Sequence, residues 1–455
     1  MKQEINKLSA PIADFVKAYA DSNTSRLHMP GHKGQSFLGC EAFDITEIYG
    51  ADSLYEADTI IAESEANAAK LFGSGRTVFS TEGSSQCIRA MLYLCMLNGK
   101  KGGRPVVVAA RNVHKSFIYA AALLDFDVIW LWPEGNTESI CSCPVSPETL
   151  EQILKENKDS VAAVYLTCPD YLGGQADLRR FAEICHQNDT ILAVDNAHGA
   201  YLHFLEPSQH PLDLGADICC DSAHKTLPVL TGGAYLHISR QAPEIFREQA
   251  KNAMGLFGST SPSYLIMASL DLCNQYLAEG YKEKLKETAD RIDRYRKNLE
   301  SKGWKVRKTD PLRLTIEIPK GISSEVLTSQ LRQHQVECEY ADPDFLVFML
   351  TPENTEQDLE KLMTALGENL CPYIEKDQLP LVRTRQMLSI REAMFSVPER
   401  IPVTQACGRT CRVPTVSCPP AIPIAVPGEY MDESVTKLFQ YYGMEYLDAV
   451  KKIEE

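Results

Sequence analysis

Asp221-Ser222-Ala223-His224-Lys225-Thr226 is the stretch that decides the fold, when it is taken together with Asp195-Asn196-Ala197-His198 earlier in the chain. Each segment continues a short apolar run of strand character, at 216–220 and 191–194. A carboxylate at one strand end and a lysine just past the next suit pyridoxal-phosphate chemistry. The lysine amine can form an imine with the cofactor aldehyde, and the aspartate can keep the pyridine nitrogen protonated. Taken singly, each residue is also explained by turn formation or solvent exposure.

Apolar runs alternate with helical patterns through the first two thirds of the chain. Strands are predicted at 77–80, 106–109, 128–132, 161–167, 191–195, 216–221 and 234–238, with helices at 86–97, 114–124, 147–156 and 178–187. Continuous apolar strands separated by helices are typical of a mostly parallel sheet covered on both faces. Ligands of such sheets bind beyond the carboxyl ends of the strands, where Asp195 and Lys225 lie.

The remaining segments predict further domains. Helices are expected at 12–20 and 57–72, and a polar helix at 282–301 connects to a strand–helix–strand–helix pattern at 312–318, 323–333, 345–350 and 356–366. The end of the chain is rich in proline and closes with a helix at 433–442. We therefore predict an N-terminal arm and loop (1–40), a large cofactor-binding domain (41–280), a small α/β domain (281–375) and a C-terminal domain (376–455).

Composition excludes several classes of protein. The net charge of −15 over 455 residues argues against a nucleic-acid partner. No apolar run reaches the length of a membrane span, and the polar N-terminus does not resemble a signal peptide. The fifteen cysteines are scattered without zinc spacing, so we expect reduced thiols in the cytoplasm and no metal site.

Two further segments could contact the cofactor. Gly83-Ser84-Ser85 opens a predicted helix, where backbone N–H groups, two hydroxyls and the helix dipole suit a phosphate. Serine at a helix start is also an ordinary N-cap. His114 follows the strand at 106–109 and could stack on a flat ring, or could simply begin a helix. Lys115 beside it is a competing candidate for the imine lysine.

The motifs together resemble the fold-type-I, pyridoxal-phosphate-dependent ornithine/lysine/arginine decarboxylases, in the short bacterial form without an N-terminal wing domain. The resemblance runs in order over nearly the whole chain. It rests on 28–34, 43–47, 83–85, 112–116, 195–200, 222–228, 259–264, 419–423 and 427–429. It implies an aspartate aminotransferase-like large domain with a mostly parallel seven-stranded sheet, plus the small α/β and C-terminal domains. It also implies a homodimer with active sites at the interface, alone or within a higher oligomer.

The resemblance assigns roles to individual residues. Lys225 would carry the imine, Asp195 would hold the pyridine nitrogen, and His114 would stack on the ring. The cofactor phosphate would be bound by residues of the glycine loop and of the lysine segment: Gly83, Ser84, Ser85, Ser222 and His224. His198 would lie near the ring, and Ser259 or Thr260 would reach the phosphate of the neighbouring subunit. His32, Asp52 and Glu429 are candidates for contacting the substrate.

The implied reaction is loss of CO2 from the α-carbon of arginine, lysine or ornithine, giving agmatine, cadaverine or putrescine. Lys225 or His224 would return the proton to the α-carbon. Three positions depart from the family pattern: Glu82, Asp170 and Gly232 stand where relatives commonly have Asn, Thr and Gln. The departures at Glu82 and Asp170 leave the substrate open.

Two other readings remain open. An aminotransferase or lyase of the same fold would place an arginine for the substrate carboxylate, for which Arg383, Arg385 and Arg391 are available. A non-catalytic homologue could act by binding alone, although the complete set of lysine, aspartate and histidine speaks against it.

Overall fold

The central feature of the fold is a seven-stranded sheet. The computed structural model describes residues 8–99, 103–367, 382–414 and 420–452. The strands are β1 (Arg76–Ser80), β2 (Val106–Ala110), β3 (Asp127–Leu131), β4 (Val161–Thr167), β5 (Ile191–Asp195), β6 (Ile218–Asp221) and β7 (Ala234–Ile238). Their order is β1-β7-β6-β5-β4-β2-β3. Strand β7 is antiparallel to β1 and β6, whereas β2 is parallel to β3 and β4, and β5 is parallel to β6, so the predicted mostly parallel α/β fold is confirmed.

Burial explains why the strands could be found from the sequence. Every residue of β5 is buried, and all of β4 is buried except its last residue. Strands covered on both faces must be apolar throughout, and this produces continuous runs instead of alternation. The seven predicted strands all occur, and their observed bounds differ from the predicted ones by at most two residues.

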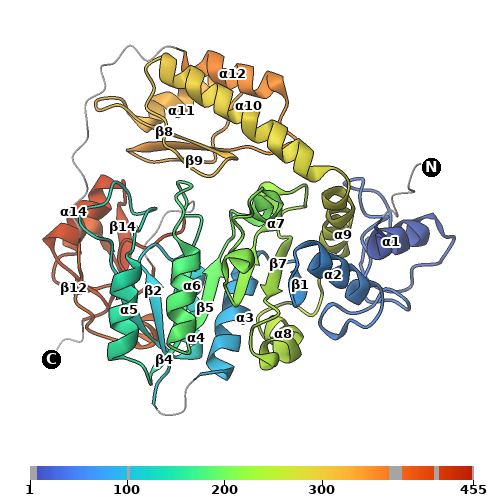
Figure 1. Ribbon diagram of the computed structural model, residues 1–455, viewed down its shortest axis with the longest axis horizontal. Coiled ribbons are helices and arrows are strands. Elements are labelled where there is room, and N and C mark those ends of the chain that lie inside the picture. The colour runs from blue at the N-terminus through green and yellow to red at the C-terminus, as the bar shows by residue number, and fades with distance from the viewer. Residues whose placement is uncertain (1–7, 100–102, 368–381, 415–419, 453–455) are drawn as a thin grey trace. The chain divides into compact units, whose positions relative to one another are not determined.

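Contacts divide the chain into two compact units. The first comprises residues 1–98 and 191–286. Besides β1 and β5–β7 it contains α1 (Pro11–Asp21), η1 (Leu54–Glu56), α2 (Ile60–Leu71), α3 (Ser84–Leu97), η2 (Ala200–Phe204), η3 (Pro211–Leu214), α7 (Ala223–Thr226), α8 (Glu244–Leu256) and α9 (Tyr264–Ala278). Helix α3 packs against α8, and α1 packs against α9 (Figure 1). The helices α8 and α9 were not predicted.

The second unit comprises residues 99–190 and 287–455. It contains β2–β4 with α4 (Lys115–Leu124), α5 (Pro147–Glu156) and α6 (Leu178–Gln187), and most of α10 (Tyr281–Ser301). A small antiparallel sheet follows, ordered β8-β10-β9, from β8 (Arg313–Glu317), β9 (Tyr340–Ala341) and β10 (Phe345–Met349). The helices α11 (Ser324–Gln333) and α12 (Glu356–Leu366) pack together beside this sheet (Figure 1).

The C-terminal segment is more regular than its proline content suggests. It forms α13 (Ile390–Phe395), β11 (Pro398–Pro402), η4 (Val403–Gln405), β12 (Arg409–Thr410), β13 (Tyr430–Met431), α14 (Glu433–Tyr441) and β14 (Tyr446–Val450). Strand β11 pairs with β14, and β12 pairs with β13. Prolines occupy both ends of β11, where a missing N–H costs least. The predicted domain boundaries stay predictions, and the one at 375/376 lies outside the described residues.

None of the described helices combines the length and the apolar character that crossing a bilayer requires.

Candidate active site

Lys225 lies on α7, a single helical turn that begins directly after β6 and Ser222. Its Nζ is 2.8 Å from Nε2 of His198, a side chain that is only 6 % exposed. Lys225 itself is half-buried. A short turn held by the end of a buried strand fixes the direction of the lysine, and the imidazole gives its amine a defined partner. The arrangement suits an amine that must react at one place.

Asp195 is the last residue of β5, and its side chain is buried, with 2 % exposure. It pairs in register with Cys220 of the parallel neighbour β6. Its Oδ1 accepts a 3.1 Å hydrogen bond from the backbone N–H of Ala197. The carboxylate and the lysine turn therefore follow the carboxyl ends of two adjacent strands, as the sequence predicts.

A buried network that the sequence reading missed supports the turn after Asp195. Asp221, the last residue of β6, accepts hydrogen bonds from Asn196 Nδ2 at 2.7 Å and from His210 Nε2 at 3.0 Å. His237 Nε2 lies 3.4 Å from the same carboxylate. Burial alone would raise the pKa of Asp221, but His210 and His237 outweigh it and hold that pKa well below its usual range. In the sequence, the only indication of this buried network was the carboxylate of Asp221 directly before Ser222.

The predicted phosphate cradle lies at the start of α3. Gly83 precedes the helix with φ of +72°, a conformation that glycine adopts without strain. The hydroxyls of Ser222 and Ser84 are 2.8 Å apart, although the two residues come from different elements. Ser84 and Ser85 are half-buried. Two serines and the first N–H groups of a helix are a donor set suited to a phosphate.

The backbone of Gly232 contacts Gly83 at the start of the predicted phosphate cradle. Its carbonyl accepts a 2.7 Å hydrogen bond from the N–H of Gly83. It adopts φ of +100°, and a Cβ added there would lie 2.8 Å from the carbonyl oxygen of Thr81. The departure from the family's glutamine therefore has a local reason, because the backbone at this position leaves no room for a side chain.

We expect Gly232→Ala to weaken cofactor binding and to lower the free energy of unfolding by about 2–4 kcal/mol, from left-handed strain plus the clash. Gly280→Ala is the matched control. Gly280 also has a positive φ, of +72°, but a Cβ there would meet nothing closer than 3.9 Å. Thermal melts and cofactor titration of both variants check this. Equal effects in the two would remove the proposed link between Gly232 and the cradle.

Glu82 joins a second loop to the cradle. Its Oε1 accepts a hydrogen bond from the backbone N–H of Ser259, and Ser259 and Thr260 are both exposed. The loop is thus tied to the phosphate segment of its own chain. The role of Ser259 or Thr260 toward a neighbouring subunit stays a prediction.

His224 places Nδ1 3.0 Å from the carbonyl of Gly233, which orients its ring.

His114 belongs to the second unit, where it is the N-cap of α4. Its Nδ1 accepts a 3.1 Å hydrogen bond from the N–H of Ser116. In the structure His114 therefore begins a helix, which was the alternative to ring stacking. Its stacking on the cofactor ring stays a prediction. Asp170, in the same unit, accepts a 2.7 Å hydrogen bond from Gly174 N–H, so this departure from the family pattern stabilises a turn.

The three substrate candidates already have structural partners. Glu429 is 1 % exposed, forms a 3.0 Å ion pair with Arg111, and accepts from the N–H of Val426. Asp52 accepts four backbone N–H bonds around the start of α2; although burial opposes this, together these bonds lower the pKa of Asp52. His32 Nε2 lies 3.1 Å from Asp44. Their roles toward a substrate stay predictions, to which these contacts add no support.

The donor set of the first unit fits pyridoxal phosphate. It offers a primary amine on a short turn, a buried carboxylate at the adjacent strand end, and two hydroxyls that meet at a helix start. These are the three groups that an aldehyde, a pyridine nitrogen and a phosphate require.

Comparison with known proteins identifies the family. Residues 10–318 match the model of the Orn/Lys/Arg decarboxylase major domain. The chain is 29 % identical to the arginine decarboxylase of Halalkalibacterium halodurans, covering 93 % of this chain and 91 % of the relative. It is also 29 % identical to the arginine decarboxylase of Bacillus subtilis, covering 94 % and 93 %.

Solved structures agree on the fold. The lysine decarboxylase LdcF of Francisella novicida superposes with a TM-score of 0.81 at 18 % identity, covering 98 % of this chain and 82 % of the other. Lysine decarboxylase A of Pseudomonas aeruginosa gives 0.80 at 17 % identity, covering 97 % and 80 %. The chain therefore belongs to the Orn/Lys/Arg decarboxylase family, and it is a pyridoxal-phosphate-dependent decarboxylase of basic amino acids with the fold of the type I enzymes.

Proposed function

We propose that this enzyme decarboxylates arginine to agmatine, with Lys225 and Asp195 as the central residues of its site. The observation that carries the proposal is the placement of Lys225 and Asp195 just past the ends of the parallel neighbours β6 and β5. The choice of arginine rests on full-length similarity to arginine decarboxylases at 29 % identity. A lysine decarboxylase of Pseudomonas aeruginosa matches at 23 %, over only 66 % of this chain.

Each proposed cofactor-binding residue would hold one part of the cofactor. Lys225 would bind it covalently through the ε-amine, and Asp195 would hold a proton on the pyridine nitrogen. Ser84, Ser85 and Ser222, with the first N–H groups of α3, would bind the phosphate. His114 is proposed to stack on the ring, and His198 to lie near it. When bound, pyridoxal phosphate supplies a cationic conjugated ring that accepts the electron pair of the breaking bond to the carboxylate.

Side chains of the protein would carry out the proton transfers and position the substrate. His198 Nε2, 2.8 Å from Lys225 Nζ, can accept a proton from the ammonium and leave a neutral, nucleophilic amine. Residues that fix the orientation of the substrate's carboxylate in the site would select decarboxylation over other reactions. Lys225 or His224 would then donate the proton that replaces CO2 on the α-carbon.

We expect kcat/KM for arginine to exceed the values for lysine and ornithine by about tenfold or more, since a site built for a guanidinium leaves hydrogen-bonding groups unpaired with an ammonium. The measurement is CO2 release from the cofactor-loaded enzyme with each amino acid, together with identification of the amine. A preference for lysine or ornithine would reject the substrate assignment alone. Formation of a keto acid without CO2 would reject decarboxylation.

We also propose a homodimer that works in the cytoplasm. Every cysteine that the structure describes is a free thiol, and most are buried, which suits a reducing compartment. The predicted interface position of the active site is tested by mixing two inactive variants, one in the Lys225 segment and one at Ser259 and Thr260. Recovery of activity in the mixture supports shared sites.

A further inference from the structure

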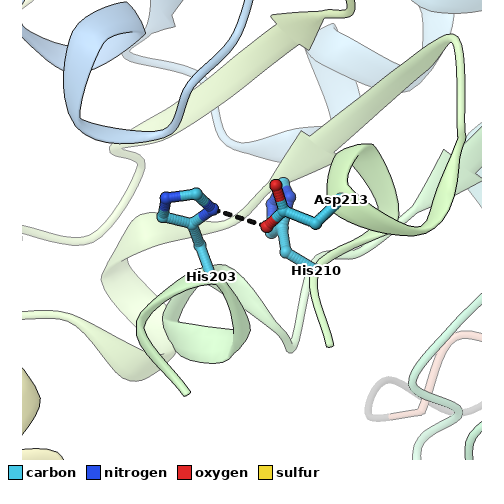
Figure 2. Close-up of side chains that lie close together, drawn as sticks. All are labelled: His203, His210 and Asp213. Carbon is cyan, nitrogen blue, oxygen red and sulfur yellow. Dashed lines mark hydrogen bonds and ion pairs between the residues drawn. The ribbon is translucent and has the colours of Figure 1, made fainter. Parts of the chain in front are cut away.

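Three side chains with metal-binding atoms converge in the segment that follows His198. They are His203 on η2, His210 just before η3, and Asp213 on η3, all within the first unit (Figure 2). One nitrogen from each histidine and one carboxylate oxygen all lie within 4.8 Å of one another. None of these residues has a role in the proposed reaction.

His203 and Asp213 form the outer part of the cluster. Nδ1 of His203 is 2.6 Å from Oδ2 of Asp213, as the dashed line in Figure 2 shows. Their side chains are 20 % and 33 % exposed, so an ion can reach them from solvent. Ser208 donates its hydroxyl to the same carboxylate oxygen. Binding a cation here would replace the proton shared by His203 and Asp213 and would require only a small separation of the two side chains.

His210 forms the inner part of the cluster, and its ring is oriented by the carboxylate of Asp221. Its side chain is fully buried, and Nε2 lies 3.0 Å from Oδ2 of Asp221. Because Nε2 is directed at Asp221, the nitrogen of His210 that would bind the ion is Nδ1. In the structure Nδ1 accepts a 3.4 Å hydrogen bond from the backbone N–H of Leu212, which the ion would replace. A carboxylate behind a histidine is the usual support of a metal ligand, since it fixes the tautomer and raises the basicity of the ring.

A second group, His210 with Cys219 and Asp221, is less suited to a cation. All three residues are buried, and burial raises the pKa of the Cys219 thiol well above its usual value. Asp221 already accepts hydrogen bonds from Asn196 and His210. The group of His203, His210 and Asp213 has solvent access, and Asp221 orients its buried histidine, so it is the better site for a metal ion.

We propose that His203, His210 and Asp213 bind one divalent transition-metal ion of the zinc type. Two imidazoles and one carboxylate suit Zn²⁺ or Co²⁺, whereas Mg²⁺ and Ca²⁺ prefer oxygen ligands alone. Three protein ligands leave a fourth position for water. The ion would join η2 to η3, in the segment that connects the strand of Asp195 to the strand before Lys225. The expectation of no metal rested on cysteine spacing, and these ligands are not cysteines.

The test is titration of the full-length, cofactor-loaded enzyme with Co²⁺, whose visible absorption reports coordination. The protein carries Cys407→Ser, because Cys407 is an exposed thiol that could bind the probe. We expect one Co²⁺ per chain with the intense absorption of a four-coordinate ion. His203→Ala and Asp213→Asn are each expected to weaken binding by about 100-fold or more. His334→Ala, an exposed histidine at the end of α11, is the matched control and should bind as before.

Circular-dichroism melts without metal show whether each variant is folded. Asp213→Asn changes an exposed side chain conservatively and decides the question if His203→Ala does not fold. The proposal is overturned if Co²⁺ gives no saturable absorption in the folded enzyme, or if folded Asp213→Asn binds it with unchanged affinity. Neither readout depends on turnover, so the result is separate from that of the proposed reaction.

Discussion

Replacing Lys225 with alanine is expected to reduce turnover by about 10⁴-fold or more and to abolish covalent attachment of the cofactor. The physical reason is the loss of the amine on the lysine turn, whose Nζ the structure places 2.8 Å from Nε2 of His198. Attachment is measured by the visible absorbance of the purified protein and by mass after borohydride reduction. The variant should still fold, because Lys225 is half-buried on a turn whose backbone bonds remain.

Two control variants make the result specific. Lys225→Arg keeps the positive charge beside His198 but cannot act as the nucleophile, so it should be as inactive as the alanine variant. Lys115→Ala removes the competing lysine at the start of α4 and should leave attachment intact. Retained covalent cofactor in Lys225→Ala, together with its loss in Lys115→Ala, would transfer the assignment to Lys115.

The sequence was sufficient to predict the sheet and the positions of Asp195 and Lys225 at the ends of its strands. Buried strands such as β4 and β5 are continuous apolar runs up to their last residue, and the carboxyl ends of β5 and β6 locate Asp195 and the lysine turn without any structure. The helix start at Gly83 was visible for the same kind of reason, since glycine and serine are local signals. Each of these predictions depends on residues that are close in sequence.

The contacts that were missed join residues far apart in sequence. Asn196 and Asp221 are 25 residues apart in the sequence. Asp221 and His237 lie on different strands, so no periodic pattern within one element indicates that they pair. The clash that keeps Gly232 a glycine involves Thr81, on another strand connection. Helix α9 was not predicted from the sequence because it buries Asp271 and Asn274 together with its apolar residues, which obscures its amphipathic pattern.

Asp195→Asn is expected to lower kcat by about 10³-fold while leaving the fold unchanged. The amide has the shape of the carboxylate, and its oxygen can still accept the hydrogen bond from Ala197 N–H. It cannot stabilise a positive charge on the pyridine nitrogen, so the electron pair left by CO2 has a weaker acceptor. A loss of this size corresponds to about 4 kcal/mol of transition-state stabilisation.

Asp217→Asn is the matched control for that prediction. Asp217 is also a buried aspartate beside the same two strands, where it accepts a 2.8 Å hydrogen bond from the N–H of Leu192. It should change the melting temperature but not kcat per folded enzyme, since its carboxylate has a structural partner and no assigned chemistry. If Asp195→Asn retains near wild-type kcat with cofactor bound, Asp195 does not hold the pyridine nitrogen. Equal losses in both variants would instead indicate a general effect of removing buried charge from this part of the sheet.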